Sequence, residues 1–332
     1  MTSAPQTMAD HSGRNAVGAI RRMFRDRPIV PLLILLAALI GALQVAQPGM
    51  LSGAWASSTL RFAVPLAILA ACQTMTMLTG GIDLSVATVA SMSAYVVYTQ
   101  TPSEGPWIAI AIAIVAALIV GIANGIGVGV FRVHPLIMTI GMSLVVLGLI
   151  TVYQRIMFAH GAAIPPEVAW LGAGTTIGFL PNSLFLFVPL AAVLLLILRR
   201  TGFGRLLYAV GDNETAARLS GVRVWQVLLV LYVLAALLAG VAGIVYAGVT
   251  NTATAGLADG LLLPSVAAAV IGGTSIFGGR GGYEGSIVGA LILTVLTTLL
   301  TVLQMPEPVR QILFGAIILA VASAYTRIID ET

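Results

Sequence analysis

The sequence predicts an all-α integral membrane protein with about ten transmembrane helices. Of its 332 residues, 59% are hydrophobic and only 8% are charged, and the mean hydropathy is +1.04. A soluble domain carries about 25% charged residues, so this composition indicates a chain that crosses a bilayer repeatedly. Long apolar runs between short polar connections indicate the same, because about 20 apolar residues span a membrane as a helix.

Ten apolar segments are expected to be membrane-spanning helices, although some are only marginally long enough. They cover residues 29–47, 61–79, 84–100, 107–130, 136–158, 183–198, 225–249, 262–278, 285–304 and 309–325. We therefore expect one transmembrane domain over residues 29–327, with an N-terminal tail at 1–28 and a C-terminal tail at 328–332. A cleaved signal peptide usually has a shorter leader and a shorter apolar core, so the first segment is expected to be retained.

The arginines determine the expected orientation. All 16 basic residues are arginine, and basic residues favour the cytoplasmic side of a membrane. With the N-terminus in the cytoplasm, every arginine except Arg61, Arg155 and Arg310 falls on that side. Both tails are therefore expected to be cytoplasmic. The absence of lysine excludes a Walker A phosphate loop, and the single cysteine, Cys72, excludes an intrachain disulfide or a cysteine-based metal cluster.

The most polar part of the chain is residues 199–224, here called the polar loop, which holds a quarter of all charged residues. Because it is rich in arginine and flanked by apolar segments, it is expected in the cytoplasm. Within it, Asp212 is expected to cap a short helix that ends at Gly221. Its small apolar face is expected to consist of Ala216, Ala217 and Leu219. A helix of about two turns is not stable alone, so it packs either on its own membrane domain or on a partner.

Among the polar residues within or beside the apolar segments, four are singled out as candidates for function: Asp83, Ser85, Asn124 and Thr139. A carboxylate near the bilayer is costly, so Asp83 is expected to face protein or a water-filled cavity, and its position also suits a cap for the helix that follows it. Asn124 either forms an interhelical hydrogen bond or binds substrate hydroxyls. Residues 80–83 form either a cytoplasmic turn or a break inside the membrane.

Glycines are expected mainly at close contacts between helices. Gly121, Gly125 and Gly129 are spaced to lie on one helix face, which predicts helix–helix packing. The glycine-rich segment 272–282 lacks the spacing and the lysine of a phosphate loop, and we expect a tightly packed cytoplasmic turn there. His134 has no second histidine at ligand spacing, so no metal site is expected, and no residue set is spaced for catalysis.

Four motifs are distributed in order along the chain. They are Gly80-Gly81-Ile82-Asp83-Leu84-Ser85-Val86; Asn124-Gly125 followed by Pro135, Ile137, Thr139 and Gly141; Gly202-Phe203-Gly204 continuing to Arg218-Leu219-Ser220-Gly221; and Gly272-Gly273-Thr274-Ser275 with Gly278-Gly279. In type and order they resemble the sugar-type permease subunits of bacterial ATP-binding-cassette (ABC) importers, such as the ribose, galactose and galactofuranose permeases. The resemblance covers residues 60–325.

The resemblance implies a multi-pass permease subunit of the bacterial inner membrane that pairs with itself or a close homologue. Two cytoplasmic ABC ATPase subunits would consume ATP, a periplasmic solute-binding protein would deliver a small-molecule substrate, and this chain would need no cofactor. The expected ATPase-coupling residues are Asp212, Asn213, Glu214, Ala216, Ala217, Leu219, Ser220 and Gly221. The expected substrate-path residues are Asp83, Ser85, Asn124 and Thr139. The arginines lie at membrane boundaries rather than in one patch, so no nucleic acid partner is expected.

Two other functions stay open. A secondary transporter usually needs intramembrane carboxylates or histidines, and Asp83 is the only acidic residue well inside the apolar segments. An ABC importer of a non-sugar solute, such as an amino acid or a nucleoside, also fits the sequence. Leu262 and Pro264 stand where the resembling permeases usually carry Glu and Asp, and this difference near the outer end of a helix bears on the substrate class.

Overall fold

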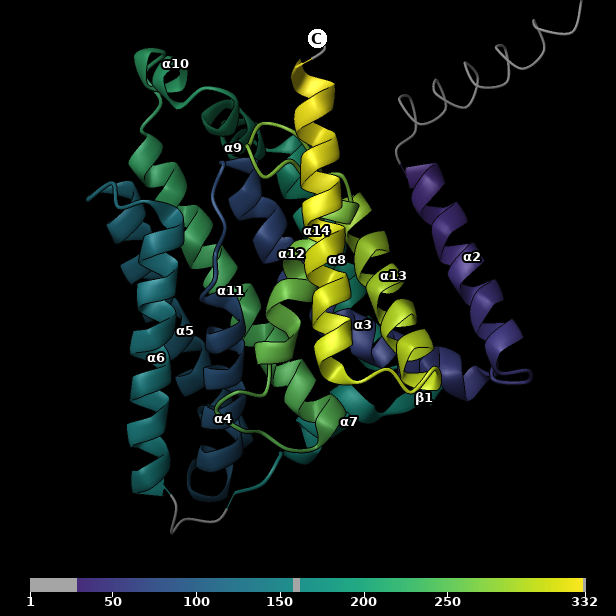
Figure 1. Cartoon of the computed structure of the whole chain (residues 1–332). Helices are drawn as coiled ribbons and strands as arrows, with labels where there is room; N and C mark the ends of the chain where they lie inside the picture. Colours follow the sequence, from purple (N-terminus) through teal and green to yellow (C-terminus); the bar gives the residue numbers. More distant parts are fainter. Residues whose placement is uncertain (1–28, 158–161, 331–332) are drawn as a thin grey trace, which may run out of the picture.

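The computed structural model describes residues 29–157 and 162–330, so the expected N-terminal tail at 1–28 lies outside the described residues. The described chain is a bundle of long helices with one small hairpin (Figure 1). In this part, a helix stands at each of the ten apolar segments that the sequence predicts. These helices are α2 (Ile29–Ala46), α3 (Gly53–Leu78), α4 (Val86–Glu104), α5 (Pro106–Gly129), α6 (Pro135–Met157), α8 (Ser183–Arg200), α11 (Val224–Thr250), α12 (Leu262–Ile271), α13 (Tyr283–Val302) and α14 (Glu307–Asp330).

Shorter elements connect these helices. They are α7 (Pro166–Ala173), β1 (Thr175–Ile177), β2 (Leu180–Pro181), α9 (Gly202–Asp212), α10 (Glu214–Leu219) and the 3-10 helix η1 (Asp259–Leu261). The two strands pair in antiparallel register, with Thr175 opposite Pro181.

Seven helices of the described chain are long and apolar enough to cross a membrane: α2, α3, α5, α6, α8, α11 and α13. The expected class, a mostly helical multi-pass membrane protein, is confirmed. The helices α4, α12 and α14 do not belong to this set, and α12 has only 10 residues. The number of ten crossings therefore stays a prediction.

Helix α11 lies at the centre of the bundle and packs against α3, α4, α5 and α7. Its contact with α5 uses the three glycines spaced along one face of that helix. A Cβ added at Gly121, Gly125 or Gly129 would come within 2.8 Å of an atom of α11. The expectation that these glycines allow close helix packing is confirmed, because any side chain there would push the two helices apart.

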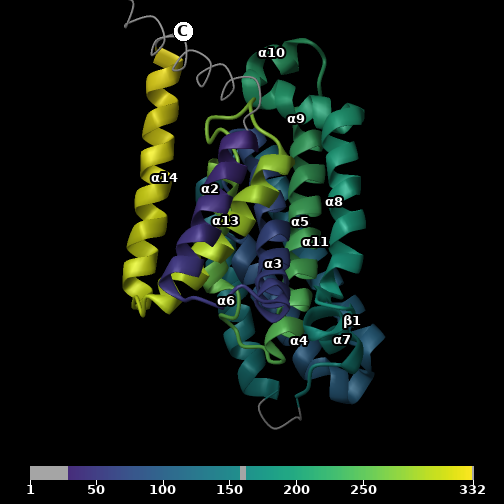
Figure 2. The ribbon, with the colours of Figure 1, turned by 90° about the vertical axis from the view of Figure 1, so that its right-hand side faces the viewer.

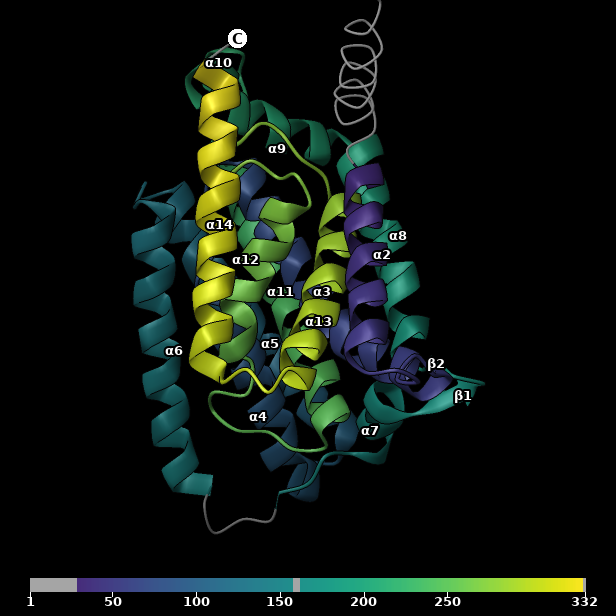
Figure 3. The same ribbon diagram turned by 45° about the vertical axis from the view of Figure 1, so that its right-hand side comes forward.

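The bundle has two different ends. Figure 2 shows α9 and α10 at one end and α7 with the β1–β2 hairpin at the other. The first residue of α2 and the last residue of α14 lie at the α10 end (Figures 1 and 3). The arginine distribution predicts that this end is cytoplasmic, and the side of each terminus stays a prediction. On the outer faces of α5 and α6, exposed residues such as Ile119, Leu144 and Leu149 fit a lipid-facing surface.

The connection between α3 and α4 is not a simple surface turn. Residues 79–85 leave α3 at the α9 end and run back into the bundle before α4 begins at Val86 (Figure 1). The side chains that bond to this segment come from Gln73, Asn124 and Thr139, each at least one turn inside its own helix. From Gly81 onward the non-helical backbone is therefore enclosed by protein, as backbone at membrane depth must be, whereas Gly80 is exposed.

Candidate functional site

Helix α9 lies across the end of the bundle and places α10 beyond it (Figure 3). Its first turn is capped by Thr201, whose hydroxyl oxygen accepts a hydrogen bond from the backbone N–H of Gly204 at 3.2 Å. One side of the helix is buried through Leu207 and Val210. This amphipathic helix is thus fixed to the bundle by its own apolar face.

Helix α10 has well-defined ends. Asn213, and not Asp212 as expected, is its N-cap: the Asn213 Oδ1 atom accepts from the backbone N–H of Ala216 at 2.9 Å, whereas Asp212 is the last residue of α9. The expectation that Gly221 ends the helix is confirmed. Gly221 has φ +87°, its N–H donates to the carbonyl of Arg218, and the next N–H donates to the carbonyl of Ala217, which is a Schellman motif.

Most of α10 faces outward. Ala217 is its one buried residue, at 6% exposure, and it packs on the main core of the bundle. Leu219 is 85% exposed, and Ala216 is also exposed. The predicted apolar face is therefore divided, because Ala217 points inward while Ala216 and Leu219 point away from the chain. An exposed ion pair between Glu214 and Arg218 spans the helix surface.

The base of α10 is clamped to the rest of the bundle by the glycine-rich segment 272–282. The Tyr208 hydroxyl on α9 donates to the Gly281 carbonyl at 2.8 Å. Partial burial, followed by the nearby Glu284 carboxylate, raises the pKa of Tyr208, so this hydroxyl keeps its proton. In addition, the Nε atom of Arg199 lies 2.5 Å from the Oε1 atom of Glu284, which links α8 to α13. The expectation of a tightly packed turn at 272–282 is confirmed.

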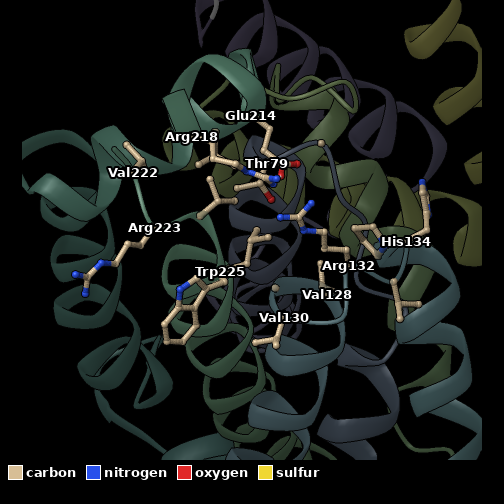
Figure 4. Close-up of a pocket in the computed structure, with 17 residues that line it drawn as sticks. Thr79, Val128, Val130, Arg132, His134, Glu214, Arg218, Val222, Arg223 and Trp225 are labelled. Atoms are coloured by element: carbon tan, nitrogen blue, oxygen red, sulfur yellow. The ribbon is translucent and has the colours of Figure 1, made fainter. Parts of the chain in front are cut away.

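A pocket of about 790 Å³ lies beneath α10. It is bounded by α10, by the connection between α5 and α6, and by the first turn of α11. Figure 4 shows Glu214 and Arg218 of α10 directed towards Thr79 and Arg132, while Trp225 lies at the base of α11. The pocket therefore brings α10 close to the start of the segment 79–85.

The four predicted substrate-path residues lie together at the far end of that segment, each no more than 1% exposed. Asp83 Oδ1 accepts from the backbone N–H and the hydroxyl of Ser85, at 2.9 and 2.6 Å. Asn124 Nδ2 donates to the Ser85 oxygen at 2.9 Å, and the Thr139 oxygen accepts from the backbone N–H of Leu84 at 3.1 Å. In this conformation the four residues bond to one another and to backbone, and protein encloses them.

Three expectations about this network can be compared with its geometry. Asp83 does not cap the helix expected from residue 84, because α4 begins at Val86 and the carboxylate instead closes a local turn onto Ser85. Asn124 forms the interhelical hydrogen bond that was one of its two expected roles. Within the segment 80–83, Gly81 and Asp83 are buried in the bundle, whereas Gly80 is exposed and lines the pocket beneath α10.

Sequence analysis missed one member of the network, Gln73. Its Nε2 atom donates to the Asp83 carbonyl at 2.8 Å, and its Oε1 atom accepts from the Asp83 N–H at 3.4 Å. Gln73 is completely buried in α3. An amide in the middle of an apolar run was the available signal, since such a group requires a partner in the membrane.

A helical bundle with seven helices, among the described residues, that are long and apolar enough to cross a membrane defines a multi-pass membrane protein. The model of one protein family, described as the permease component of a branched-chain amino acid transport system, matches residues 55–322. This range covers most of the chain, and the chain belongs to this family. No solved structure matches it significantly.

Curated relatives carry more specific names. The ribose import permease protein of Escherichia coli is 32% identical over 259 residues, which are 76% of this chain and 79% of that protein. The galactofuranose transporter permease protein of the same species is 32% identical over 282 residues, or 83% and 81% of the two chains. The fructose import permease protein of Rhizobium meliloti is 32% identical over 305 residues, or 88% and 84%. The resemblance drawn from the four motifs is confirmed.

Proposed function

We propose that this chain is the membrane-spanning permease subunit of an ABC importer that carries a sugar or a related small polar solute across the bacterial inner membrane. A second permease subunit would complete the path, ABC ATPase subunits would bind at the α10 end, and a solute-binding protein would deliver the solute at the opposite end. The names of three sugar-import relatives, each about one-third identical over most of the chain, support this proposal.

The outward-facing Leu219 is the observation that carries the proposal. A helix of six residues has little stability of its own, yet α10 is capped at both ends and buries only Ala217 against the bundle. If α10 served only its own domain, the larger apolar side chain would be expected to face inward. The 85% exposure of Leu219 fits a residue that becomes buried in a groove of a soluble ATPase.

Residues 212–221 would then transmit the ATPase movement. Helix α9 contacts the end of α3 through Gly211, and the segment 79–85 begins directly after that contact. A displacement of α10 would reach the segment through α9 and would strain the bonds that hold Asp83 and Ser85. The four substrate-path residues would contact the solute only after the Asn124–Ser85 hydrogen bond opens, which is how a closed path becomes an open one.

Two descriptions bear on the solute. The family model is named for branched-chain amino acids, whereas the relatives above are named for ribose, galactofuranose and fructose. We therefore propose a sugar, with a branched-chain amino acid as the second candidate. Competition between radiolabelled sugars and leucine for uptake by cells that contain the complete importer distinguishes the two.

The first test is to replace Leu219 with arginine. Leu219→Arg puts a charge at the centre of the proposed contact, so ATP-driven uptake should be lost and the ATPase should no longer co-purify. Leu303→Arg is the control, because Leu303 is a half-exposed leucine beyond the end of α13, on the other side of the bundle. If Leu219→Arg retains normal uptake and a bound ATPase, the coupling assignment is wrong. If the unaltered chain purifies without any ATPase, a secondary transporter becomes the favoured function.

A further inference from the structure

Another cleft lies between residues of α3, α12, α13 and α14. Figure 1 shows the start of α3, the end of α13 and the start of α14 at the end of the bundle opposite α10. Its volume is about 680 Å³, within the range of roughly 300–1,000 Å³ that is usual for small-molecule sites. Along α3 its lining extends from Ser52 to Leu66, about 21 Å at 1.5 Å per residue. This length is more than half the thickness of a hydrocarbon core, which is roughly 30 Å.

One wall of the cleft is a series of threonines on α13, here called the threonine wall. It consists of Thr294, Thr297, Thr298 and Thr301. Each hydroxyl donates to the backbone carbonyl four residues earlier, at 2.7 to 3.0 Å. Because the protons are used within the helix, the oxygen lone pairs are what a ligand meets. The threonine wall thus offers hydrogen-bond acceptors that match the O–H donors of a polyhydroxylated solute.

The facing wall combines aromatic rings with two further hydroxyl groups. Trp55, Phe62 and Tyr246 line the cleft beside Ser58 and Thr59. The Phe62 and Tyr246 rings are arranged edge to face, with centroids 6.4 Å apart and planes at 75°. A mainly apolar, aromatic lining with a few placed polar groups is typical of a small-molecule site. The C–H faces of a sugar ring would pack on these aromatic residues while its hydroxyls reach the threonine wall.

Charge selects among the possible solutes. Glu307 and Arg310 are the two charged residues that line the cleft, and the Arg310 Nη1 atom lies 3.6 Å from the Glu307 Oε2 atom. Arg310 Nε also donates to the Met305 carbonyl at 3.2 Å. The two charges neutralise each other, so an ionic solute finds no unpaired opposite charge. A zwitterionic amino acid would have to break this pair, whereas a neutral sugar would leave it intact.

We propose that this cleft is an outer binding subsite that receives a neutral, polyhydroxylated solute of sugar size before it crosses the membrane. The inference rests on the proposed importer function and names the residues and the solute class of its entry step. Sequence analysis identified only Pro264 of this lining as a position that bears on the substrate class. The cleft explains that connection, because Pro264 lies in the wall formed by α12.

Removing hydroxyls from the threonine wall tests the subsite. The double variant Thr297→Val and Thr298→Val keeps the branched shape but removes two acceptors. A net hydrogen bond of about 0.5–1.5 kcal/mol corresponds to about a twofold to tenfold change in affinity. The rate of ribose, fructose or galactose uptake at sub-saturating concentration should therefore fall by about that factor for each bond lost. Thr151→Val is the matched control, since Thr151 makes the same bond four residues back on α6, outside the cleft.

Filling the cleft provides a second, independent test. A Cβ at Gly260 meets no atom within 4 Å, so Gly260→Trp fits the fold while its ring occupies the cleft. Gly41→Trp is the control, because Gly41 on α2 is equally open and lies outside the cleft. We expect Gly260→Trp to stop uptake while the assembled complex still binds its ATPase. If the unaltered protein imports a sugar and both cleft variants import it at the same rate, the subsite is refuted and the importer function stands.

Discussion

Gly211, in the last turn of α9, lies so close to the carbonyl group of Leu78 that a Cβ at position 211 would overlap the Leu78 oxygen. The same oxygen accepts a hydrogen bond from the Gly279 N–H at 3.0 Å. Helix α9, the last residue of α3 and the glycine-rich segment therefore meet at one point. Since the segment 79–85 begins at the next residue, any movement of α9 towards the bundle acts directly on the broken connection between α3 and α4.

The substitution Gly211→Ala should separate α9 from α3. The added methyl group overlaps backbone atoms that cannot rotate away, and overpacking of this kind typically costs about 1–3 kcal/mol. We expect a lower thermal unfolding temperature and slower ATP-driven uptake. Gly202→Ala is the control on the same helix, because a Cβ there meets only the tip of Arg205 at 3.9 Å. If Gly211→Ala and Gly202→Ala have the same unfolding temperature and uptake rate, the added methyl group at position 211 does not strain the contact between α9 and α3.

The caps of α10 lead to a second prediction. Asn213→Ala removes the side chain that bonds to the Ala216 N–H, and loss of such a cap costs about 0.5–2 kcal/mol. Asp212→Ala should cost less, since Asp212 is the last residue of α9 and does not cap α10. Hydrogen exchange of the amides of residues 214–219 measures the difference. Faster exchange in Asp212→Ala than in Asn213→Ala would restore Asp212 as the cap.

The buried network leads to a third prediction. Asn124→Leu leaves the Ser85 oxygen without its donor, and a buried polar group that loses its partner costs about 1–3 kcal/mol. In this conformation Asn124 holds the segment 79–85 in place, so thermal stability of the purified protein should fall. If Asn124 instead serves only the solute, stability is unchanged and the uptake kinetics alone respond. Thr88→Val, which breaks the partly buried Thr88–Ser143 hydrogen bond in the first turn of α4, gives a reference for the loss of one hydroxyl hydrogen bond.

Much of the helical architecture could be predicted, because a long apolar run has few alternatives in a membrane. The predicted helix boundaries are wrong where polar residues or glycines determine the end of a helix. Helix α3 begins at Gly53, well before the apolar run, because Ser52 caps it and accepts from the Trp55 N–H at 3.2 Å. Helix α12 ends at Ile271, before the expected residue 278, because the glycine-rich segment follows and Gly273 has φ +88°.

The candidate site could be predicted in composition but not in arrangement. The sequence indicated Asp83, Ser85, Asn124 and Thr139 as a set, and the fold brings all four together. It did not indicate that Gln73 would hold the Asp83 backbone, since that pairing depends on the segment 79–85 turning back along α3. The outer cleft was also missed, because it combines residues of α3 and α13, which lie more than 200 residues apart in the chain, with residues of α11, α12 and α14.

The last prediction concerns the Tyr208–Gly281 hydrogen bond, which clamps α9 at the polar end of the bundle. Tyr208→Phe removes one bond of about 0.5–1.5 kcal/mol. Burial raises the pKa of Tyr208 above that of an ordinary tyrosine, so the folded protein holds this proton more tightly than the unfolded chain does. The stability linked to that proton is therefore complete below about pH 10 and is lost as the pH rises through the folded-state pKa. The thermal unfolding temperatures of the unaltered protein and of Tyr208→Phe should differ by a constant amount from pH 6 to pH 9. This difference should shrink above pH 10. A difference that already falls between pH 6 and pH 9 would mean that another group, and not Tyr208, controls the clamp.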